Sequence, residues 1–514
     1  MLTMKVWRIQ LQVLLCVVVL SVCRPITTAN VLSTVATAGK SHWTYVRAVL
    51  RALTDGGHNV TVFTPFVDGD RENYTEIDVT PFLGKPVVVD VDAMTMLNNF
   101  DGLSKSVRSI VNFTKTNCKA VHRHPKWKDF ATGRHQFDVV ISEVYGSQCA
   151  AYYARLLNVP LIFMSPTPLF TDLEPSIYGT ASNPAVVSHL LTSFGGFPKS
   201  FQERFFNVLT YVHSAVLRWY VDRTFDPQPY ELVKPIVPSL VFLNTHFITE
   251  PARLLPPNAV QIGGIHLTRP RPIPSDILEF IENSASGVIV FTLGSIISVS
   301  TLPERIQRII IEVLGQLPQR VLMKYEGNMN GKPGNVMTVK WLPQRDILVH
   351  PKVKLFISHG GISGLYEVVD AGVPVLGFPL FFDQPKNIAN LVDAGMALSL
   401  DLLTMTESEF LNTVTQLINN DTYSSNAKAA SDRFKDRPMS PAESVVYWTE
   451  YVLRHKGAPH LKSKALDLTW YQCMLLDVIG AIVAALLLIS YLAFRQLKKV
   501  YKYFYGPIAK VHRE

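Results

Sequence analysis

The chain has 514 residues, more than one hydrophobic core usually serves, so two domains are expected. Its formal net charge of +8 is concentrated at the two ends: the tail from Arg495 carries six basic residues and one acidic residue, and three further basic residues lie within the first 24 positions. Because the remainder is close to neutral, the composition argues against a surface for nucleic acid.

Residues 1–29 have the pattern of a secretory signal peptide. Lys5 and Arg8 precede an apolar run from Ile9 to Val22, and small residues follow up to Ala29. An uncleaved anchor is the alternative, although the apolar run is short for a membrane span. A cleaved signal would place the rest of the chain in the secretory pathway.

The next segment predicts the first domain, over residues 30–267. NVLSTVATAGKSHWTYVRAVLRALTDGGHNVTVFTP predicts a strand, a loop with Ser41 and His42, a helix that stops at a Gly pair, and a second strand. Strand and helix signals continue to alternate through FDVVISE and VPLIFMS, which favours a parallel sheet.

The cysteines and glycosylation sequons leave alternatives open. Cys118 and Cys149 lie in the predicted lumenal part, where a disulfide and two buried free thiols are equally compatible with the sequence. Sequons begin at Asn59, Asn73, Asn112 and Asn420. The first of these lies at a predicted strand entrance, so it is the least suited to carry a glycan.

Residues 268–275, TRPRPIPS, break the periodicity and are expected to link two domains. SGVIVFTLGS then begins a second series of strands, loops and helices that includes VLMKYE, KLFIS and PVLGFP. We therefore predict a second domain over residues 276–440, with ligands held between the strand ends of two facing, doubly wound α/β domains.

The most informative stretch is WLPQRDILVHPKVKLFISHGGISGLYEVVDAGVPVLGFPLFFDQPKN, from Trp341 to Asn387. KLFIS predicts a strand, HGG a turn and ISGLYEVVDAG a helix, whose N-terminal N–H groups favour a phosphate. VPVLGFPLFFDQ predicts another buried strand, with Asp383 and Gln384 at its carboxyl end, where open α/β sheets hold ligands.

This stretch resembles the signature of the UDP-glycosyltransferases, in their animal, membrane-bound, UDP-glucuronosyltransferase-like form. The resemblance continues through SHW, FDVVISE, FTLGS and RHKGAPHLKSKALDLTWYQ, and so covers nearly the whole chain. It implies the GT-B fold: two facing Rossmann-like α/β domains plus one C-terminal transmembrane helix. It also implies that residues 441–473, beginning PAESVVYWTEYVLRH, return to the first domain and the membrane.

The resemblance implies a catalytic base in the first domain. His42, in SHW, matches the family's catalytic histidine, and a carboxylate on its other ring nitrogen would stabilise the imidazolium. Glu143, at the end of FDVVISE, is the expected partner, although relatives often have Asp there. Asp138 is the alternative, but it begins the strand and is expected at the far end of the sheet.

The UDP-sugar is expected to contact the second domain. The resemblance assigns Trp341 to stacking on the uracil, Gln344 to its polar edge or the ribose, and Glu367 to the ribose hydroxyls. The other implied donor-binding residues are Ser295, His359, Gly361, Ser363 and Gly364 for the diphosphate, and Asp383 and Gln384 for the sugar. Many relatives carry Asn at the position of Ser363, so this contact is expected to be weaker.

No metal ion or other cofactor is expected. Asp90 and Asp92 form a D-x-D pair, which binds a divalent metal in another large class of glycosyltransferases. Because a helix N-terminus and His359 can stabilise the diphosphate, we assign this pair no catalytic role.

Residues 474–494, MLLDVIGAIVAALLLISYLAF, are long enough to span a bilayer, with a buried core helix as the alternative. The basic segment 495–514 marks the cytoplasmic side. The expected protein is a single-pass type I protein of the endoplasmic reticulum membrane with lumenal domains. Delivery to the plasma membrane and formation of a homo-oligomer stay open.

Together these features predict an inverting transferase that moves glucose or glucuronate from a UDP-sugar to a hydroxyl of a small lipophilic acceptor. A membrane-anchored UDP-sugar-binding protein without turnover is the alternative, motivated by Ser363 and Glu143, where relatives differ. A nicotinamide-dependent oxidoreductase is disfavoured, because neither opening strand is followed by GxGxxG.

Overall fold

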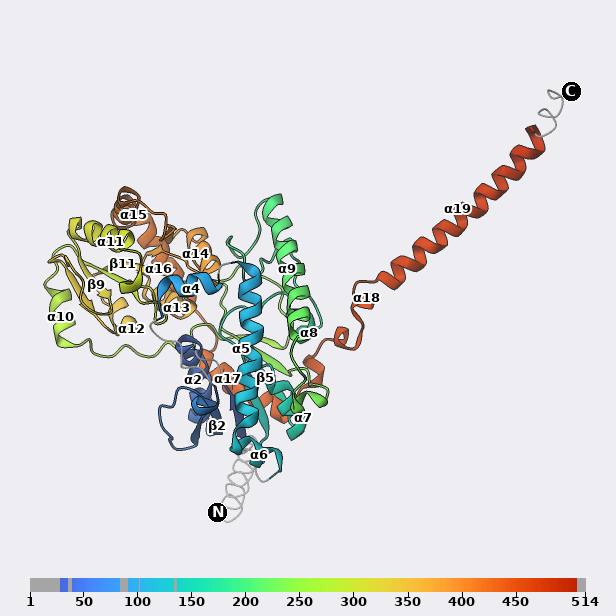
Figure 1. Ribbon diagram of the computed structural model, residues 1–514, viewed down its shortest axis with the longest axis horizontal. Helices are drawn as coiled ribbons and strands as arrows, with labels where there is room; N and C mark the ends of the chain where they lie inside the picture. Colours follow the sequence, from blue (N-terminus) through green and yellow to red (C-terminus); the bar gives the residue numbers. More distant parts are fainter. Residues whose placement is uncertain (1–27, 36–38, 84–90, 101, 134–135, 506–514) are drawn as a thin grey trace, which may run out of the picture.

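The computed structural model of the chain describes residues 28–35, 39–83, 91–100, 102–133 and 136–505. Most of the predicted signal peptide, the D-x-D residue Asp90 and the last nine residues lie outside these ranges. Within them the chain forms two lobes, and one long helix projects away from both (Figure 1). Each lobe is built around one parallel sheet.

The first lobe contains a seven-stranded sheet in which every pairing is parallel. Its strands, in spatial order, are β3 (Tyr74–Asp78), β2 (Asn59–Thr64), β1 (Asn30–Thr34), β4 (Val139–Glu143), β5 (Leu161–Ser165), β6 (Leu240–Leu243) and β7 (Ala259–Gln261). Its helices are α2 (Lys40–Asp55), α3 (Thr80–Leu83), α5 (Leu103–Arg123), α6 (Pro125–Ala131), α7 (Ala150–Leu157), α8 (Glu174–Tyr178), α9 (Phe201–Asp222) and the 3₁₀ helix η1 (Pro229–Leu232).

The second lobe contains a six-stranded parallel sheet. Its strands, in spatial order, are β10 (Val336–Val339), β9 (Arg320–Lys324), β8 (Val288–Thr292), β11 (Val353–Ser358), β12 (Val375–Gly377) and β13 (Ala397–Ser399). Its helices are α10 (Ser275–Glu282), η2 (Val299–Thr301), α11 (Glu304–Gln316), α12 (Gln344–Leu348), α13 (Ile362–Ala371), α14 (Gln384–Asp393), α15 (Glu407–Asn419) and α16 (Asp421–Lys435).

Both sheets are covered on both faces, which explains their apolar strands. Successive side chains of a strand point to opposite faces, so Val31 and Leu32 of β1 enter two different core clusters. Val288 and Ile289 of β8 divide in the same way. Strands buried on both faces need continuous rather than alternating apolar residues. This architecture confirms the predicted class, two Rossmann-like α/β domains.

The strand order reverses direction once in each sheet. The first strand, β1 or β8, has the second strand on one side and the fourth, β4 or β11, on the other. Loops leaving these two central strands therefore diverge to opposite sides. Open α/β sheets hold ligands outside the carboxyl ends of the strands at such a reversal.

Two helices cross between the lobes. Helix α4 (Ala93–Phe100) precedes most of the first lobe in sequence, yet its Ala93 and Met96 join a core cluster of the second lobe. Helix α17 (Pro441–Arg454) follows the second lobe and packs on the first, where Val445 and Val452 join the cluster of α2.

Helix α14 also joins the lobes, through polar contacts. Lys386 Nζ lies 3.1 Å from Glu250 Oε2, and both side chains are buried. Asn390 donates from Nδ2 to Thr249 O at 2.7 Å and accepts from Gly196 N at 2.6 Å. The helix that begins at the predicted sugar-binding residues is thus held directly against the first lobe.

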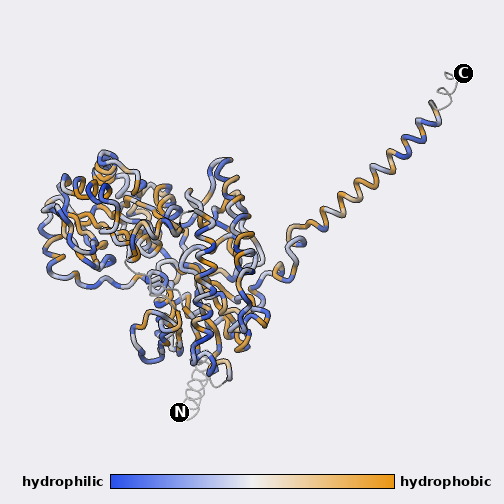
Figure 2. The backbone as a smooth tube through the Cα atoms, viewed as in Figure 1, coloured by the Kyte–Doolittle hydropathy of each residue, from blue (hydrophilic) through white to orange (hydrophobic). Residues whose placement is uncertain are grey.

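The C-terminal segment leads away from the body through η3 (Pro459–Leu461), η4 (Lys464–Asp467) and α18 (Trp470–Cys473) into α19 (Leu476–Tyr505). Among the described residues, Leu476–Phe504 of α19 is the candidate membrane span, with side chains exposed on all sides. The projecting helix is largely apolar along its first half (Figure 2). Helix α19 contains all of the predicted span, 474–494, except its first two residues, and it continues to Tyr505.

Cys118 and Cys149 form a disulfide, with their Cα atoms 5.8 Å apart. The disulfide joins α5 to the residue that precedes α7. Of the two alternatives that the sequence left open, a disulfide and two free thiols, the structure has the disulfide.

Removing one partner of the buried Lys386–Glu250 pair is expected to destabilise the protein. Lys386→Met leaves a buried carboxylate without its cation, which typically costs about 3–5 kcal/mol, whereas Lys386→Met with Glu250→Leu removes both charges and should recover most of that loss. Lys199→Ala breaks the exposed pair with Asp393 and should cost under about 1 kcal/mol. Unfolding of the purified full-length variants tests this, and equal losses in the single and double variants would contradict it.

Candidate active site

His42 and Glu143 meet at the reversal of the first sheet. His42 lies in the first turn of α2, in the connection that follows β1, and Glu143 is the last residue of the adjacent β4. His42 Nδ1 lies 2.5 Å from Glu143 Oε1. The carboxylate is fully buried while the imidazole is 31% exposed, so Nε2 is the ring nitrogen available to a substrate.

The surroundings of His42 favour the protonated imidazole. Burial by itself lowers the pKa of His42, but the charge of Glu143, the hydrogen bond to it and the more distant charge of Asp383 together raise this pKa above a histidine's ordinary value. A proton taken up at Nε2 would therefore be stabilised by the carboxylate at Nδ1. This arrangement suits a general base.

Asp138, the alternative partner of His42, lies at the opposite end of β4 from Glu143. It precedes β4, and its Oδ2 accepts a hydrogen bond from Asn30 N at 2.7 Å, where β1 begins.

Asp92, the second residue of the D-x-D pair, directly precedes α4, and its Oδ1 accepts a hydrogen bond from Thr95 N in the first turn of that helix at 2.7 Å.

Asp383 and Gln384 lie at the start of α14, facing the first lobe. Burial raises the pKa of Asp383, while a hydrogen bond from Asn387 and the charge of His42 oppose this rise. Gln384 uses Oε1 to accept from Leu380 N and Phe381 N, which leaves its amide nitrogen for a ligand. Asp383 and His42, from different lobes, are thus close enough for the charge of each to affect the pKa of the other.

Asn387 connects two of the predicted loops, a role that sequence analysis missed. Its Nδ2 donates to Asp383 Oδ2 at 2.7 Å and to Gly360 O at 2.9 Å. Next to Asp383, Phe382 has a φ of 55°, which non-glycine residues adopt mainly where the surrounding structure enforces it. The N of DQPKN, four residues after the Asp and so one helical turn away, was the available signal.

Two further predicted donor residues are hydrogen-bonded to each other. Gln344 Nε2 donates to Glu367 Oε2 at 2.6 Å. Burial raises the pKa of Glu367 to about 7, although the bond from Gln344 lowers it. At neutral pH this carboxyl is therefore divided between its charged and neutral forms, so it can act as acceptor or donor toward ribose hydroxyls.

Trp341 stands at the boundary with the first lobe. Trp341 is 58% exposed, and the Lys40 ammonium lies 4.3 Å from the centroid of its ring. This cation–π contact links the first residue of α2 to the predicted uracil-binding face. Sequence analysis had assigned Lys40 no role.

The predicted diphosphate loop joins β11 to α13. The N-terminal N–H groups of α13, at Ile362, Ser363 and Gly364, have no helical partner and confer a partial positive charge. Within the described part of the chain, Ser363 Oγ and His359 Nδ1 are both buried without a hydrogen-bond partner. Two unpaired buried polar atoms beside a helix N-terminus suit a bound anion.

His359 fits between two glycines because neither carries a Cβ. A Cβ on Gly294 would lie 2.6 Å from His359 Cε1, and one on Gly361 would lie 2.5 Å from Nε2. Gly294 also has a φ of 84°, and Ser295 follows it directly in the loop after β8. The FTLGS and HGG motifs are thus two sides of one packed unit at the reversal of the second sheet.

His359 itself is neutral at physiological pH. Burial, with a smaller effect of Lys324, lowers the pKa of His359 to about 4. It can therefore offer one N–H donor but no full positive charge. The favourable potential for an anion comes mainly from the α13 terminus.

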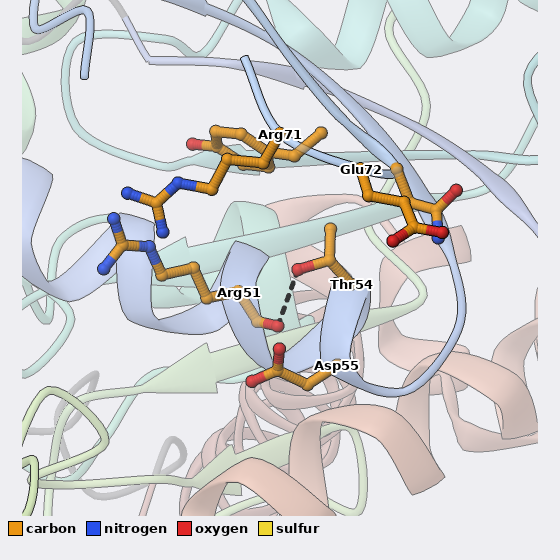
Figure 3. Close-up of a pocket in the computed structure, with 7 residues that line it drawn as sticks. Arg51, Thr54, Asp55, Arg71 and Glu72 are labelled. Carbon is orange, nitrogen blue, oxygen red and sulfur yellow. Dashed lines mark hydrogen bonds between the residues drawn. The ribbon is translucent and has the colours of Figure 1, made fainter. Parts of the chain in front are cut away.

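A separate cavity of about 300 Å³ lies at the far end of α2 (Figure 3). It is lined by Arg51, Thr54, Asp55, Arg71, Glu72, Asn73 and Tyr74. The basic and acidic side chains give it mixed charge, and none of the predicted site residues lines it.

The chain is similar to known proteins in both sequence and fold. Residues 29–511 match the family model described as UDP-glucoronosyl and UDP-glucosyl transferase. UDP-glucosyltransferase 2 of Dactylopius coccus is 36% identical over 480 residues, covering 91% of each chain. UDP-glucuronosyltransferase 2B15 of Rattus norvegicus is 32% identical over 505 residues, covering 92% of this chain and 94% of that protein.

Solved structures show the same architecture. The glycosyltransferase SnogD from Streptomyces nogalater aligns over 83% of this chain and 99% of its own, with a TM-score of 0.54 and 17% identity. The glycotransferase of kitacinnamycin aligns over 84% and 100%, also with a TM-score of 0.54 and 17% identity. At such identities the likeness shows the fold alone, and it confirms the predicted GT-B arrangement.

Gly294→Ala is expected to weaken binding of UDP, because the new Cβ displaces His359 from the diphosphate loop. Loss of a hydrogen bond to a charged group corresponds to roughly 10- to 100-fold in Kd. Gly327→Ala is the matched control, since Gly327 has a similar φ of 93° and no atom within 4 Å of the new Cβ. Calorimetric titration of UDP measures both, and equal effects would show that backbone strain, not the His359 contact, is responsible.

Proposed function

The chain belongs to the UDP-glucoronosyl and UDP-glucosyl transferase family, and from this premise we propose how it transfers a sugar. The proposed reaction moves glucose or glucuronate from a UDP-sugar to a hydroxyl of a small lipophilic acceptor, with inversion at the anomeric carbon. The observation that carries the proposal is the His42–Glu143 hydrogen bond, which uses Nδ1 of the partly exposed imidazole and leaves Nε2 for a substrate.

In the proposed step, His42 Nε2 takes the proton of the acceptor hydroxyl. The acceptor oxygen forms a bond to the anomeric carbon while the bond between that carbon and the β-phosphate oxygen breaks. Because attack comes from the side opposite the leaving group, the product has inverted configuration. Glu143 stabilises the imidazolium that results, which makes it a positioning residue that acts through His42.

The departing UDP carries the negative charge that develops in this step. The N-terminal N–H groups of α13, with His359 and the hydroxyls of Ser295 and Ser363, would stabilise it. These donors support a mechanism without a metal ion. Asp383 and Gln384 would bind the sugar hydroxyls, and Glu367 with Gln344 the ribose.

The uracil is proposed to stack on Trp341. The Lys40 ammonium lies over this ring, so uracil must either displace it or share the ring with it. Lys40 is the first residue of the helix that carries His42. Binding of uracil at Trp341 would therefore affect a side chain two residues from the catalytic histidine.

Helix α19 is proposed to anchor the enzyme in the endoplasmic reticulum membrane as a single-pass type I protein. Its apolar length supports a membrane span. Four basic residues on its last turns support a cytoplasmic end: Arg495, Lys498, Lys499 and Lys502. Both lobes would then lie in the lumen, where the Cys118–Cys149 disulfide is stable.

His42→Ala is expected to lower transfer about 10²- to 10⁴-fold, the usual contribution of a general base, while UDP binding changes little. Membranes expressing the full chain are given labelled UDP-glucose or UDP-glucuronate with phenolic and steroidal acceptors, with and without EDTA. Product from one donor, resistant to EDTA, supports the proposal. Measurable UDP binding with no product from any donor would favour a binding protein without turnover.

A further inference from the structure

The cavity at the far end of α2 is formed by two segments of the first lobe (Figure 3). Arg51, Thr54 and Asp55 come from the last turns of α2, and residues 71–74 form the turn that leads into β3. Pockets for small organic molecules have volumes of about 300–1,000 Å³. The volume of this cavity, about 300 Å³, is therefore enough for one sugar residue.

The charges of the lining favour a neutral, polar occupant. Arg51 and Arg71 are balanced by the acidic side chains of Asp55 and Glu72, so the lining has no net formal charge. An anion or a metal cation would be repelled by one of these pairs, whereas hydroxyl groups accept from guanidinium groups and donate to carboxylates. Within the described part of the chain, Arg51 Nε is buried without a hydrogen-bond partner, which leaves a donor for such an occupant.

One of the lining residues, Asn73, begins the glycosylation sequon Asn73-Tyr74-Thr75. Asn73 is exposed and has a φ of 59°, in a tight turn closed by two backbone hydrogen bonds between Arg71 and Tyr74. Thr75 is also exposed, and it lies in β3, an edge strand of the sheet. The amide that accepts a glycan and the hydroxyl that the sequon requires are therefore both on accessible residues.

The other sequons lie in different surroundings. Asn59 lies in β2, between two other strands, and its Nδ2 donates to a neighbouring side chain at 3.0 Å. Asn112 lies within α5, and the hydroxyl of its sequon, on the buried Thr114, donates to a backbone carbonyl at 2.9 Å. Asn420 is an exposed helix N-cap. None of these three asparagines lines the cavity.

We propose that Asn73 carries an N-linked glycan whose first sugar, an N-acetylhexosamine, lies in the cavity. The inference rests on the proposed placement of both lobes in the lumen. In the modification, Asn73 Nδ2 forms a bond to the anomeric carbon of this sugar and loses one proton. The bond between that carbon and the pyrophosphate of a lipid-linked oligosaccharide breaks. This oligosaccharide and the enzyme that transfers it belong to the secretory pathway.

A sugar held in the cavity would connect the last turns of α2 to the turn before β3. Its hydroxyl groups would bond to charged side chains from both segments, and such bonds are stronger than those between neutral groups. The glycan would thus stabilise the first lobe. Because His42 lies at the other end of α2, loss of the glycan should leave UDP binding unchanged.

Occupancy of the sequon is tested on the full-length chain, expressed in cells with a secretory pathway and purified in detergent. A peptide N-glycosidase in heavy-oxygen water labels each asparagine from which it removes a glycan, and mass spectrometry locates the label. We expect label at Asn73 in the wild type and in Thr75→Ser, which keeps the sequon, but not in Thr75→Ala.

Label at another sequon without label at Asn73 would overturn the inference and leave the lumenal placement intact. No label at any sequon would overturn both. Transfer activity of membranes expressing the same protein reports on the proposed reaction separately.

The position of the sugar is tested by combining Arg71→Ala with Thr75→Ala. If the sugar contacts Arg71, Arg71→Ala should lower the Tm of the glycosylated protein by about 2–4 °C and should have little effect in the unglycosylated Thr75→Ala background. Equal shifts in the two backgrounds would show that the sugar lies outside the cavity. Titration of UDP verifies that each variant is folded.

Discussion

The geometry of the candidate site depends on one partly buried hydrogen bond, between His42 and Glu143. A carboxylate with no exposed surface at the end of a strand is costly unless a partner compensates its charge. The reversal between β1 and β4 supplies that partner, because it places the first turn of α2 beside the end of β4. The strand order, the loop after β1 and the start of α2 must all be correct for this one contact to form.

The second lobe uses the same reversal for a different purpose. Between β8 and β11 the two loops enclose His359 between Gly294 and Gly361, and the N-terminus of α13 supplies the positive potential. The two reversals cooperate only if the lobes are held together, and buried polar contacts from α14 and the crossing helices α4 and α17 do this. Because α14 also begins at Asp383 and Gln384, the contacts that join the lobes also position the predicted sugar-binding residues.

Local patterns predicted the elements well, since apolar runs, Gly stops and polar strand ends depend on neighbouring residues. Strand direction also distinguished Glu143 from Asp138, and the structure places only Glu143 beside His42. The crossing of α4 and the Lys40–Trp341 contact could not be predicted, because they depend on how the two lobes pack together and no local pattern encodes that packing. The exposed apolar residues of α9 also repeat with a helical period, and a sequence cannot tell whether such a stripe is buried in a core or exposed.

The pH dependence of kcat/KM for the wild type and for Glu143→Gln tests the central claim most directly. A base must be unprotonated to act, so wild-type activity should fall as the pH drops through the pKa of His42, which Glu143 raises above the ordinary histidine value. Glutamine can still bond to Nδ1 but carries no charge, so the acid limb should move to lower pH while the maximal rate decreases. An acid limb that stays in place in the variant would contradict the account.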